Sequence, residues 1–459
     1  MLGQLLQPEI ESLIQERNWP VLKEILLEFH PSEIADIVEK IDIKDRVILF
    51  RFLPKDLATD VFEYLEFDAQ ESLLKSFTDI EIAEVINEMS PDDRTEMLED
   101  LPGPVAKKLL RLLTHEERTI AVNLLGYPES SVGRIMTPDF IAIKTEWSIE
   151  DVFLHIRNIG QNVEYIDTLY VTDSKGKLLD EVNIKEILLA NPHSKVSDIM
   201  DENVVSLSVT DDQEKAVEIF KEYDANMIPV VNNENYLVGI VTADDVFDVI
   251  EEETTEDVQK FGGMESLDLP YIATPVLQMV KKRAGWLVFL FLGEMFTATA
   301  MAFFEAEIAK AVVLALFIPL IISSGGNSGS QAATLCIRAM ALGEITLIDW
   351  WRVMRREIFS GLLLGAILGA IGFLRITVWS MIGNTYGEHW FVLALTVGFT
   401  LVGVVLWGTL TGSMLPFILR KLKLDPATSS APFVATLVDV SGLIIYFYIA
   451  ALILKGTIL

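Results

Sequence analysis

The amino-acid sequence predicts a multidomain membrane protein with three parts: an α-helical superhelical N domain, an α/β module made of two similar copies, and a transmembrane domain of five helices. Three observations predict this order. Related helical segments recur over residues 1–130, β-rich runs alternate with helical runs over residues 131–255, and long apolar stretches fill residues 284–459. Residues 256–283 are left as a connecting helix that runs up to the membrane.

The first domain contains four related helical segments, which carry Ala35, Ala58, Ala83 and Ala106 at spacings of 23, 25 and 23 residues. Each segment continues into an apolar stripe at helical spacing and stops near a turn signal such as Leu53-Pro54. This pattern predicts a superhelix of short helical repeats. Such solenoids usually bind partners or form interfaces, so a scaffold role is open beside a catalytic one and is at least as well supported.

The middle domain repeats one pattern of β-rich and helical runs. In the first copy we expect strands at residues 140–143 and 168–171 with a helix at 151–159 between them. In the second copy we expect strands at 204–207, 227–231 and 237–241 and a helix at 212–223. The opening Met136-Thr-Pro, the tandem copy and the motif Gly239-Ile-Val-Thr-Ala-Asp-Asp245 resemble a pair of cystathionine β-synthase (CBS) domains. The first copy is irregular, because Leu178-Leu-Asp-Glu-Val182 stands where a Gly-Ile-Val strand is expected.

Charge divides the chain. Residues 1–270 carry 23 Lys and Arg against 58 Asp and Glu, a net charge of −35, whereas residues 271–459 carry 13 against 9. The strongly acidic residues 1–270 repel the phosphates of nucleic acid. This charge argues against a nucleic-acid partner and favours divalent cations or basic partners. Runs of charge are usually solvated surfaces, so composition by itself favours solubility as the explanation. The single cysteine, Cys336, forms no internal disulfide, which fits a reducing cytoplasm, and nothing at the N-terminus looks like a signal peptide.

The membrane domain begins after the basic triplet Lys281-Lys-Arg283, which marks a cytoplasmic edge. Because about twenty apolar residues cross a bilayer, we expect spans at residues 285–304, 311–338, 358–380, 390–419 and 427–454. With this start, most basic loop residues fall on the side of the amino-terminal domains. The sequence therefore predicts cytoplasmic N-terminal domains and an external C-terminus.

A Gly- and Ser-rich segment interrupts the second span at residues 323–330. We expect irregular backbone there, and irregular backbone at membrane depth is tolerated only where it lines a cavity or is buried in protein. Asn327 and Gln331 add amides that hydrocarbon tolerates poorly, which favours a cavity. A packing kink is the alternative.

Asp439 is the only charged residue of the apolar stretch 431–454, and Ala435 lies on the same helical face. An intramembrane carboxylate is costly and indicates an ion or proton pathway. Oxygen ligands suit Mg²⁺, which keeps much of its water. A protonated acid, or a pair with Arg338 or Arg375, is the alternative. Glu294, within the first span, is either a second pathway carboxylate or a neutral hydrogen-bonding group.

The soluble half offers two acidic faces, one in the helical domain and one on a predicted acidic helix at residues 244–257. Facing carboxylates repel unless cations bridge them, so the two faces can act as a switch. A merely solvated helix explains the second face equally well. The carboxylates of these faces are Asp92, Asp93 and Glu96 in the helical domain and Asp244, Asp245, Asp248, Glu251, Glu252, Glu253, Glu256 and Asp257 on the acidic helix.

The order of these parts, with Gly326-Asn-Ser-Gly-Ser-Gln-Ala332, Asp425-Pro-Ala and Pro432-Phe-Val-Ala-Thr-Leu-Val-Asp439, closely resembles the MgtE magnesium channels along essentially the whole chain. The resemblance implies a homodimer in the plasma membrane, with a pore between the subunits lined by the second and fifth spans. It implies that Asp439 and the Ala435 carbonyl hold hydrated Mg²⁺, and that cytosolic Mg²⁺ bridging the helical domain, the CBS pair and the connector closes the pore. The candidate residues for this cation sensor are Asp92, Asp93, Glu96, Asp244, Asp245, Asp248, Glu251, Glu252 and Asp257. The pore-lining candidates are Asn327, Gly329, Gln331 and Glu294.

The resemblance also implies that the CBS pair can bind ATP, for which Thr242 and Asp245 are the nucleotide candidates. A membrane-anchored CBS sensor of divalent cations or nucleotides without transport is the competing function. A membrane anchor needs neither the polar segment at residues 323–330 nor Asp439, so these two features favour the channel over the anchored sensor. We find no hydrolytic or metalloprotease motif and expect no enzyme.

Overall fold

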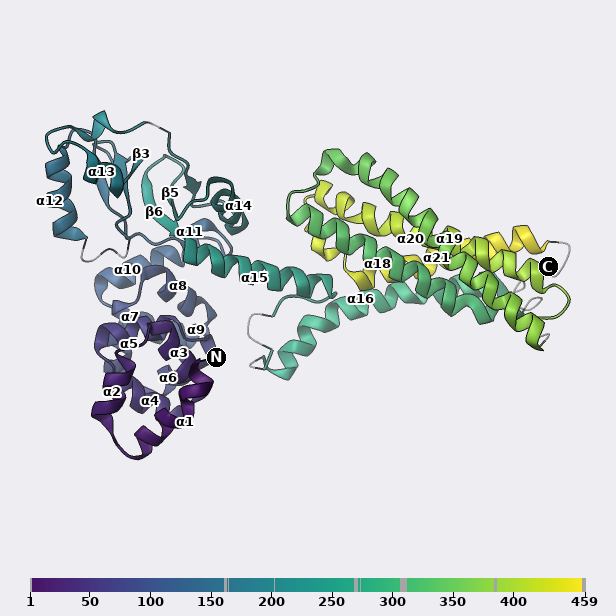
Figure 1. The fold of residues 1–459 in the computed structure, drawn as a ribbon, viewed down its shortest axis with the longest axis horizontal. Helices are drawn as coiled ribbons and strands as arrows, with labels where there is room; N and C mark the ends of the chain where they lie inside the picture. Colours follow the sequence, from purple (N-terminus) through teal and green to yellow (C-terminus); the bar gives the residue numbers. More distant parts are fainter. Residues whose placement is uncertain are drawn as a thin grey trace. The chain divides into compact units, whose positions relative to one another are not determined.

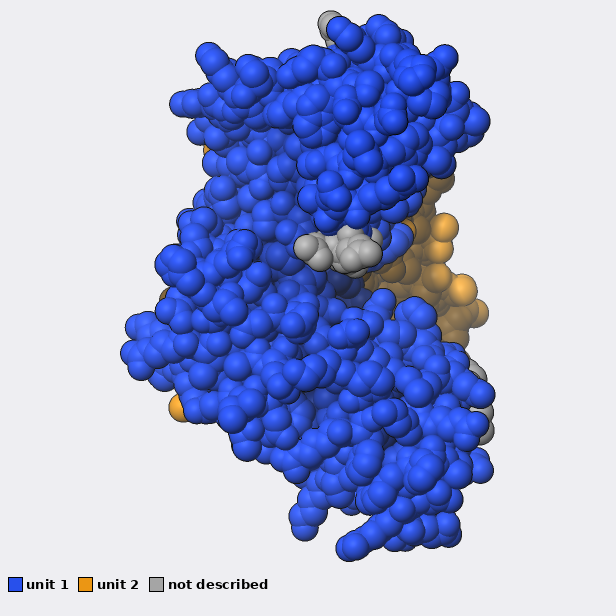
Figure 2. Space-filling view, turned by 90° about the vertical axis from the view of Figure 1, so that its left-hand side faces the viewer, with its two compact units in different colours: residues 1–252 blue, residues 253–459 orange. Residues whose placement is uncertain are grey.

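The computed structural model describes residues 2–160, 163, 165–201, 203–267, 271–272, 274–305, 312–383 and 386–455. The chain divides into two compact units, residues 1–252 and 253–459, each of which is described by itself (Figures 1 and 2).

The first unit begins with a stack of short helices (Figure 1). Their bounds are α1 (Leu2–Gln15), α2 (Trp19–Leu26), α3 (Pro31–Lys40), α4 (Ile43–Phe52), α5 (Lys55–Glu63), α6 (Phe67–Ser76), α7 (Asp79–Glu88), α8 (Pro91–Asp100), α9 (Gly103–Leu112) and α10 (His115–Leu124). The four alanine segments fall in α3, α5, α7 and α9, which pack one on the next in that order. The predicted helical repeat is confirmed.

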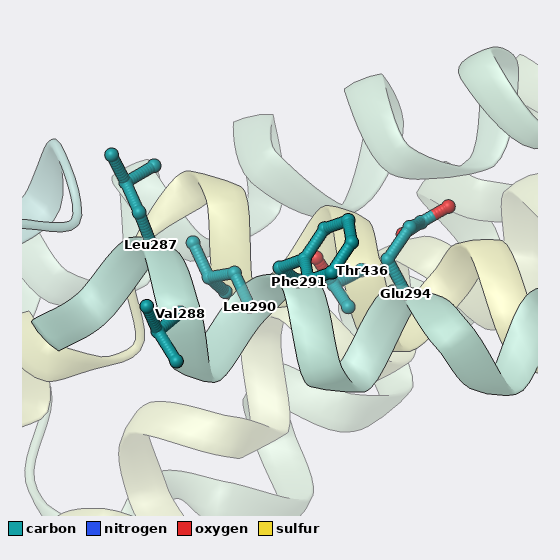
Figure 3. Close-up of a pocket in the computed structure, with 6 residues that line it drawn as sticks. All are labelled: Leu287, Val288, Leu290, Phe291, Glu294 and Thr436. Carbon is teal, nitrogen blue, oxygen red and sulfur yellow. The ribbon is translucent and has the colours of Figure 1, made fainter. Parts of the chain in front are cut away.

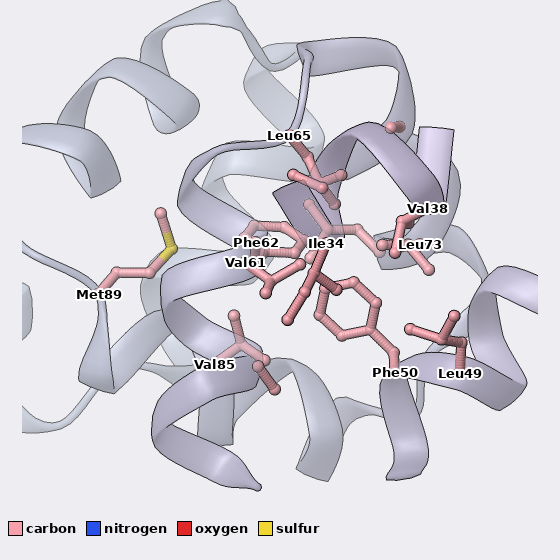
Figure 4. Packing of buried hydrophobic residues seen from close by; sticks show 14 of the residues in the cluster. Ile34, Val38, Leu49, Phe50, Val61, Phe62, Leu65, Leu73, Val85 and Met89 are labelled. Atoms are coloured by element: carbon pink, nitrogen blue, oxygen red, sulfur yellow. The ribbon is translucent and has the colours of Figure 1, made fainter. Parts of the chain in front are cut away.

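The apolar stripes of these helices meet in one continuous core (Figure 4). Ile34, Phe50, Phe62 and Leu73 are almost completely buried within it. Burying such a side chain contributes about 1.5–3 kcal/mol, which explains why helices too short to be stable alone persist here. Arg94 is also fully buried, where its guanidinium donates to the Ile86 and Met89 carbonyls and pairs with Glu117, so α8 is joined to α7 and α10.

Two small three-stranded sheets follow, and both have the same topology. Their elements are α11 (Val132–Ile135), β1 (Ala142–Lys144), α12 (Ile149–Ile159), β2 (Thr168–Thr172), β3 (Leu178–Asn183), α13 (Ile184–Leu189), η1 (Val196–Asp198), β4 (Leu207–Ser208), α14 (Gln213–Tyr223), β5 (Met227–Val231) and β6 (Leu237–Thr242). In each sheet the first strand is parallel to the second and the second antiparallel to the third. The predicted tandem copy is confirmed, and its first copy is a complete one.

Helix α15 (Ala243–Phe261) contains the predicted acidic helix and begins directly after β6. The expected connecting helix at 256–283 is wrong, because α15 ends at Phe261 and α16 (Val276–Phe303) begins fifteen residues later. Gly263 has a φ of +76°, and the Met264 N–H donates to the Gln259 carbonyl over 3.3 Å. This left-handed glycine ends the helix, as in many helix C-termini.

Among its described residues, the second unit contains five helical stretches long and apolar enough to cross a membrane: Val276–Phe303, Val312–Ala341, Leu347–Gly383, Trp390–Lys421 and Ala431–Leu454. They comprise α16, η2 (Val312–Phe317), α18 (Ile318–Ala341), η3 (Leu347–Asp349), α19 (Trp350–Gly383), α20 (Trp390–Lys421), η4 (Pro426–Thr428) and α21 (Ala431–Leu454). Helix α20 packs against α18, α19 and α21, and α16 packs against α21 (Figure 1). The five predicted spans are confirmed, several with longer bounds.

The expected irregular backbone at residues 323–330 is wrong, because α18 is helical throughout that segment. The glycines instead let two helices touch. A Cβ at Gly408 would lie 2.3 Å from the Gly325 carbonyl oxygen, and one at Gly412 would lie 2.0 Å from that of Gly329. Small residues at such crossings are the usual means of close packing between membrane helices. The packing alternative therefore explains these glycines.

Candidate functional site

One face of α18 is polar and exposed. Ser323, Asn327 and Gln331 recur every four residues and are exposed on this face, whereas the intervening Gly325 and Gly329 are buried against α20. Asn327 donates to the Ser323 hydroxyl over 3.4 Å. A helical spacing of four keeps these groups on one side. Gly329, expected to line a pore, is instead a packing residue.

Asp439 lies beside this polar face. A Cβ added at Gly326 would lie 3.4 Å from the Ala435 Cβ and 3.7 Å from an Asp439 carboxylate oxygen. Asp439 is partly buried, and no ion pair joins it to Arg338 or Arg375 among the described residues. Arg375 instead lies over the Trp379 ring. The structure thus brings Asp439 and Ala435 of α21 to the Gly-rich face of α18.

Glu294 approaches the same carboxylate from α16. It is exposed and lines a shallow groove with Phe291 and Thr436, which Figure 3 shows from the side of α16. A Cβ at the preceding Gly293 would lie 3.0 Å from the Thr436 side chain, so Glu294 lies where α16 packs closely on α21. The groove is otherwise apolar, being completed by Leu287, Val288 and Leu290.

Hydrogen bonds fix the helix that carries Asp439. The Ser330 hydroxyl of α18 donates to the Ala431 carbonyl over 3.2 Å, and the Trp407 indole of α20 donates to Ser441 over 2.7 Å. At the far end, the Tyr446 hydroxyl donates to the Leu314 carbonyl over 2.9 Å. Helix α21 is therefore held at its beginning, middle and end.

The second candidate site lies in the first unit, where carboxylates of α8 and α15 act on each other. The pKa of Glu96 is raised to about 8, because surrounding protein displaces water from it and because Asp248 and Asp93 lie near. The pKa of Asp248 is raised to about 6 by partial burial and then by Asp93. Partial loss of surrounding water is the main cause of both pKa shifts, and repulsion between the carboxylates adds to it.

Other members of this cluster have protein partners. The Asp93 carboxylate accepts a bond of 2.6 Å from Ser90, and burial raises its pKa. Asp244 accepts a bond of 3.0 Å from the Tyr165 hydroxyl, and Glu252 accepts one of 3.2 Å from Gln213. Glu251 contributes to the field at Asp248, and Asp92 to that at Asp245. The cluster brings together the predicted residues Asp92, Asp93, Glu96, Asp244, Asp245, Asp248, Glu251 and Glu252.

Within the described part of the chain, no three His, Cys, Asp or Glu side chains are arranged to hold one metal ion together. The acidic groups of α8 and α15 therefore form a field of negative charge. Mg²⁺ dehydrates reluctantly and usually keeps several waters, so carboxylates can hold it through those waters.

Asp245 and Thr242, the nucleotide candidates, bond to each other. One Asp245 oxygen accepts both the Thr242 hydroxyl, at 2.5 Å, and the Thr242 N–H, at 3.0 Å. This pair fixes the junction between β6 and α15. Burial and the Asp92 charge raise the pKa of Asp245 well above its usual range.

The irregular first CBS copy has a structural reason that the sequence did not reveal. In the second copy, a Cβ at Gly239 would lie 2.8 Å from both the Met136 sulfur and the Thr137 carbonyl oxygen, so glycine is needed there. Asp180 holds the corresponding position in β3, where it is buried and accepts the N–H groups of Glu181 and Asp201. In the first copy the Asp180 side chain therefore makes hydrogen bonds at the position where, in the second copy, the backbone approaches Gly239 closely.

Asp257, the last of the predicted sensor residues, belongs to the second unit, whereas the α8 carboxylates belong to the first. Burial and the charge of Asp425 raise its pKa. Beside it, Lys260 pairs with Glu256 one turn earlier and with Asp425 at 2.9 Å. The sequence analysis missed Lys260, whose i,i+4 spacing from Glu256 was the available signal.

Family models match along the chain. Residues 29–130 match the MgtE intracellular N domain, residues 132–192 and 196–252 match the CBS domain, and residues 318–449 match MgtE, described as a divalent cation transporter.

Relatives match over nearly their whole length. The chain is 35% identical to magnesium transporter MgtE of Thermus thermophilus, over 97% of this chain and 98% of that protein. It is 30% identical to magnesium transporter MgtE of Enterococcus faecalis, over 94% of each.

Solved structures resemble its soluble part. The cytosolic domain of the Mg²⁺ channel MgtE in complex with ATP has a TM-score of 0.51 and 31% identity, covering 53% of this chain and all of that one. The soluble part of a magnesium transporter has a TM-score of 0.52 and 27% identity, covering 55% of this chain and 99% of that one. With its helical N domain, paired CBS domains and five apolar helices, this chain belongs to the MgtE family of membrane transporters.

Proposed function

We propose that the protein is a Mg²⁺-selective channel that mediates Mg²⁺ uptake across the plasma membrane and is closed by cytosolic Mg²⁺. The observation that carries the proposal is the position of Asp439, a carboxylate within a membrane-spanning helix, beside the polar face of α18. Relatives that cover almost the whole chain are named magnesium transporters, which supports the choice of ion.

Asp439 and the Ala435 carbonyl are the proposed ion site. A carboxylate in a span is expensive unless water or a cation compensates its charge. Asn327 and Gln331 supply neutral oxygens for the ion's remaining waters along the same face. Such an arrangement holds a hydrated ion without stripping its shell, which suits Mg²⁺ and lets the ion leave again.

A homodimer follows from the exposure of that face. Ser323, Asn327 and Gln331 are polar and exposed in one copy of the chain, and hydrocarbon tolerates such groups poorly. A second copy facing the first across a watery pathway covers them without a lipid contact. In this dimer, each subunit contributes one Asp439, and two carboxylates attract a divalent cation more strongly than one.

Cytosolic Mg²⁺ closes the proposed channel through the α8 and α15 carboxylates. These carboxylates lie near one another and are partly shielded from water, so they repel when ionised, and a divalent cation that neutralises them favours this arrangement. Without Mg²⁺ the two faces separate. ATP is a further proposed ligand of the CBS domains, because the MgtE cytosolic domain that the chain resembles was solved with ATP.

The decisive experiment measures Mg²⁺ influx into proteoliposomes that contain the intact chain. Asp439→Asn removes one charge with little change of volume, and we expect it to reduce influx at least tenfold. Glu344→Gln is the control, because Glu344 is an exposed residue between two spans. Equal influx through Asp439→Asn and Glu344→Gln would reject the ion site, and no influx through the intact chain would favour the membrane-anchored CBS sensor.

A further inference from the structure

The acidic helix α15 ends in a joint with the helix that carries Asp439. Eight of its residues are acidic, and Lys260, in its last turn, is its one basic residue. The Lys260 ammonium pairs with Glu256 on its own helix and with Asp425, which is 165 residues further along the chain. The side chains of Lys260 and Asp425 are 29% and 35% exposed, so water screens this pair less than a surface pair.

Asp425 uses its two carboxylate oxygens for different purposes. One accepts the Lys260 ammonium at 2.9 Å, and the other accepts the Ala427 N–H at 2.8 Å at the start of η4. The Thr428 hydroxyl also donates to the Asp425 carbonyl over 2.6 Å. The ion pair is therefore attached to a fixed turn, and α21 begins three residues after that turn.

A second set of contacts joins the same elements. A Cβ at Gly263 would lie 2.7 Å from the Trp286 ring and 3.3 Å from the Pro432 ring, so the turn after α15 is packed closely on α16 and α21. The Trp286 indole donates to the Ser430 hydroxyl over 3.1 Å, and this hydroxyl accepts the Phe433 N–H at the start of α21.

From that start, α21 is helical without interruption past Asp439. Eight residues separate Ala431 from Asp439, a length of about 12 Å at 1.5 Å per residue. A helix of this length moves as a rod, so displacement of its first turn displaces Asp439 and Ala435. Removing the ammonium would also leave Glu256, Asp257 and Asp425 close together as uncompensated carboxylates, which repel.

We propose that Lys260 is a positioning residue for ion passage: its ammonium holds Asp425, and through it the start of α21, on the end of α15, so that movement of α15 reaches Asp439. This inference rests on the proposed channel function. The Lys260 ammonium is part of the chain and holds Asp425 at every Mg²⁺ concentration. Mg²⁺ therefore acts on the α8 and α15 carboxylates, while the contact between Lys260 and Asp425 stays in place.

The test uses the full chain in proteoliposomes and the Mg²⁺ concentration, on the side of the soluble domains, that halves each variant's own influx. We expect Lys260→Met to raise that concentration about fivefold, the effect of losing one coupling contact. Lys260→Arg keeps the charge and should retain most of the coupling. Lys281→Met removes a charge from the exposed beginning of α16 and should change nothing. An unchanged half-inhibiting concentration in Lys260→Met would overturn the proposal.

A double-mutant cycle separates this role from general stability. Asp425→Asn keeps an acceptor for the Ala427 N–H but removes the charge, and it carries the same test if Lys260→Met does not fold. If the two residues act through each other, the double variant should resemble either single variant, whereas additive effects would contradict the joint.

Hydrogen exchange tests the joint without any transport. Residues 426–435 should exchange faster in Lys260→Met than in the intact chain, and equal exchange would refute the joint even if the intact chain passes no Mg²⁺. An intact chain that conducts nothing would reject the proposed function alone.

Discussion

Neutralising Glu96 should stabilise the Mg²⁺-free protein. The pKa of Glu96 is raised to about 8 in the folded protein, above its ordinary value of 4.5, by displaced water and then by Asp248 and Asp93. A group whose folded pKa is raised binds its proton more tightly when folded. Its ionisation therefore costs stability, and the cost grows as pH rises from about 4.5 to about 8. Glu96→Gln removes this cost.

The size of the effect follows from the shift. A change of about 3.5 pKa units corresponds to about 5 kcal/mol at full strength. Neighbouring protein displaces only part of the water around Glu96, whose side chain keeps an exposed surface, so solvent screening reduces this to about 1 kcal/mol. For a unit of about 250 residues, 1 kcal/mol raises the unfolding temperature by about 2–4 °C. We expect that rise for the full chain in detergent with a Mg²⁺ chelator near pH 8.

Saturating Mg²⁺ should remove the advantage in unfolding temperature that Glu96→Gln has over the intact chain. Bound cations neutralise the intact cluster, so the intact chain should gain more thermal stability from Mg²⁺ than Glu96→Gln does. Glu88→Gln, on the exposed surface of α7, should behave like the intact chain under both conditions. If Glu96→Gln unfolds at a lower temperature without Mg²⁺, or gains as much from Mg²⁺ as the intact chain, the carboxylate cluster is not a cation switch.

Three further results are expected. Gly412→Ala should destabilise the membrane domain by about 2–3 kcal/mol, because its Cβ would lie 2.0 Å from the Gly329 carbonyl oxygen. Gly403→Ala, whose Cβ would meet only side-chain ends at 3.3 Å, should cost less in the same detergent-unfolding assay, and equal costs would contradict the packing. The Mg²⁺ affinity of the soluble domains, measured by calorimetry, should rise between about pH 5 and pH 7, because protons compete for Asp248, whose pKa is raised to about 6. A flat profile would contradict this competition. Asn327→Leu should lower Mg²⁺ influx severalfold with little change in thermal stability, since the Asn327 side chain is exposed and its 3.4 Å hydrogen bond to Ser323 is long and weak; unchanged influx would remove Asn327 from the pathway.

Local patterns predicted most of the fold. The alanine spacing identified α3, α5, α7 and α9 because each repeat must place the same apolar stripe against its neighbour. Strands β5 and β6 lie where the apolar runs predicted them, because strands of this kind are buried and bounded by turns.

The errors came from tertiary contacts. Residues 323–330 read as irregular because glycine disfavours an isolated helix, yet the contact of Gly325 and Gly329 with α20 stabilises the helix there. Propensity is overridden where two backbones can approach so closely. A connecting helix was expected across residues 256–283, whereas α15 ends at Phe261, because a glycine at position 263 is compatible with either a turn or a helix until its contact with Trp286 is known.

The candidate sites were predictable in chemistry but not in arrangement. Asp439 stood out because a charge in a span is costly, and its Ala435 neighbour followed from helical spacing. The approach of Glu294 to Asp439 needed the packing of α16 on α21. The Lys260 and Asp425 pair joins residues that no sequence period connects.

Mg²⁺ influx through the intact chain, at low and at high Mg²⁺ on the side of the soluble domains, tests the central claim most directly. The account predicts rapid influx at low Mg²⁺ and strong inhibition at high Mg²⁺, with the inhibition relieved when the carboxylates of α8 are neutralised. Influx that is the same at both concentrations would contradict Mg²⁺ gating, and no influx at low Mg²⁺ would contradict the channel itself.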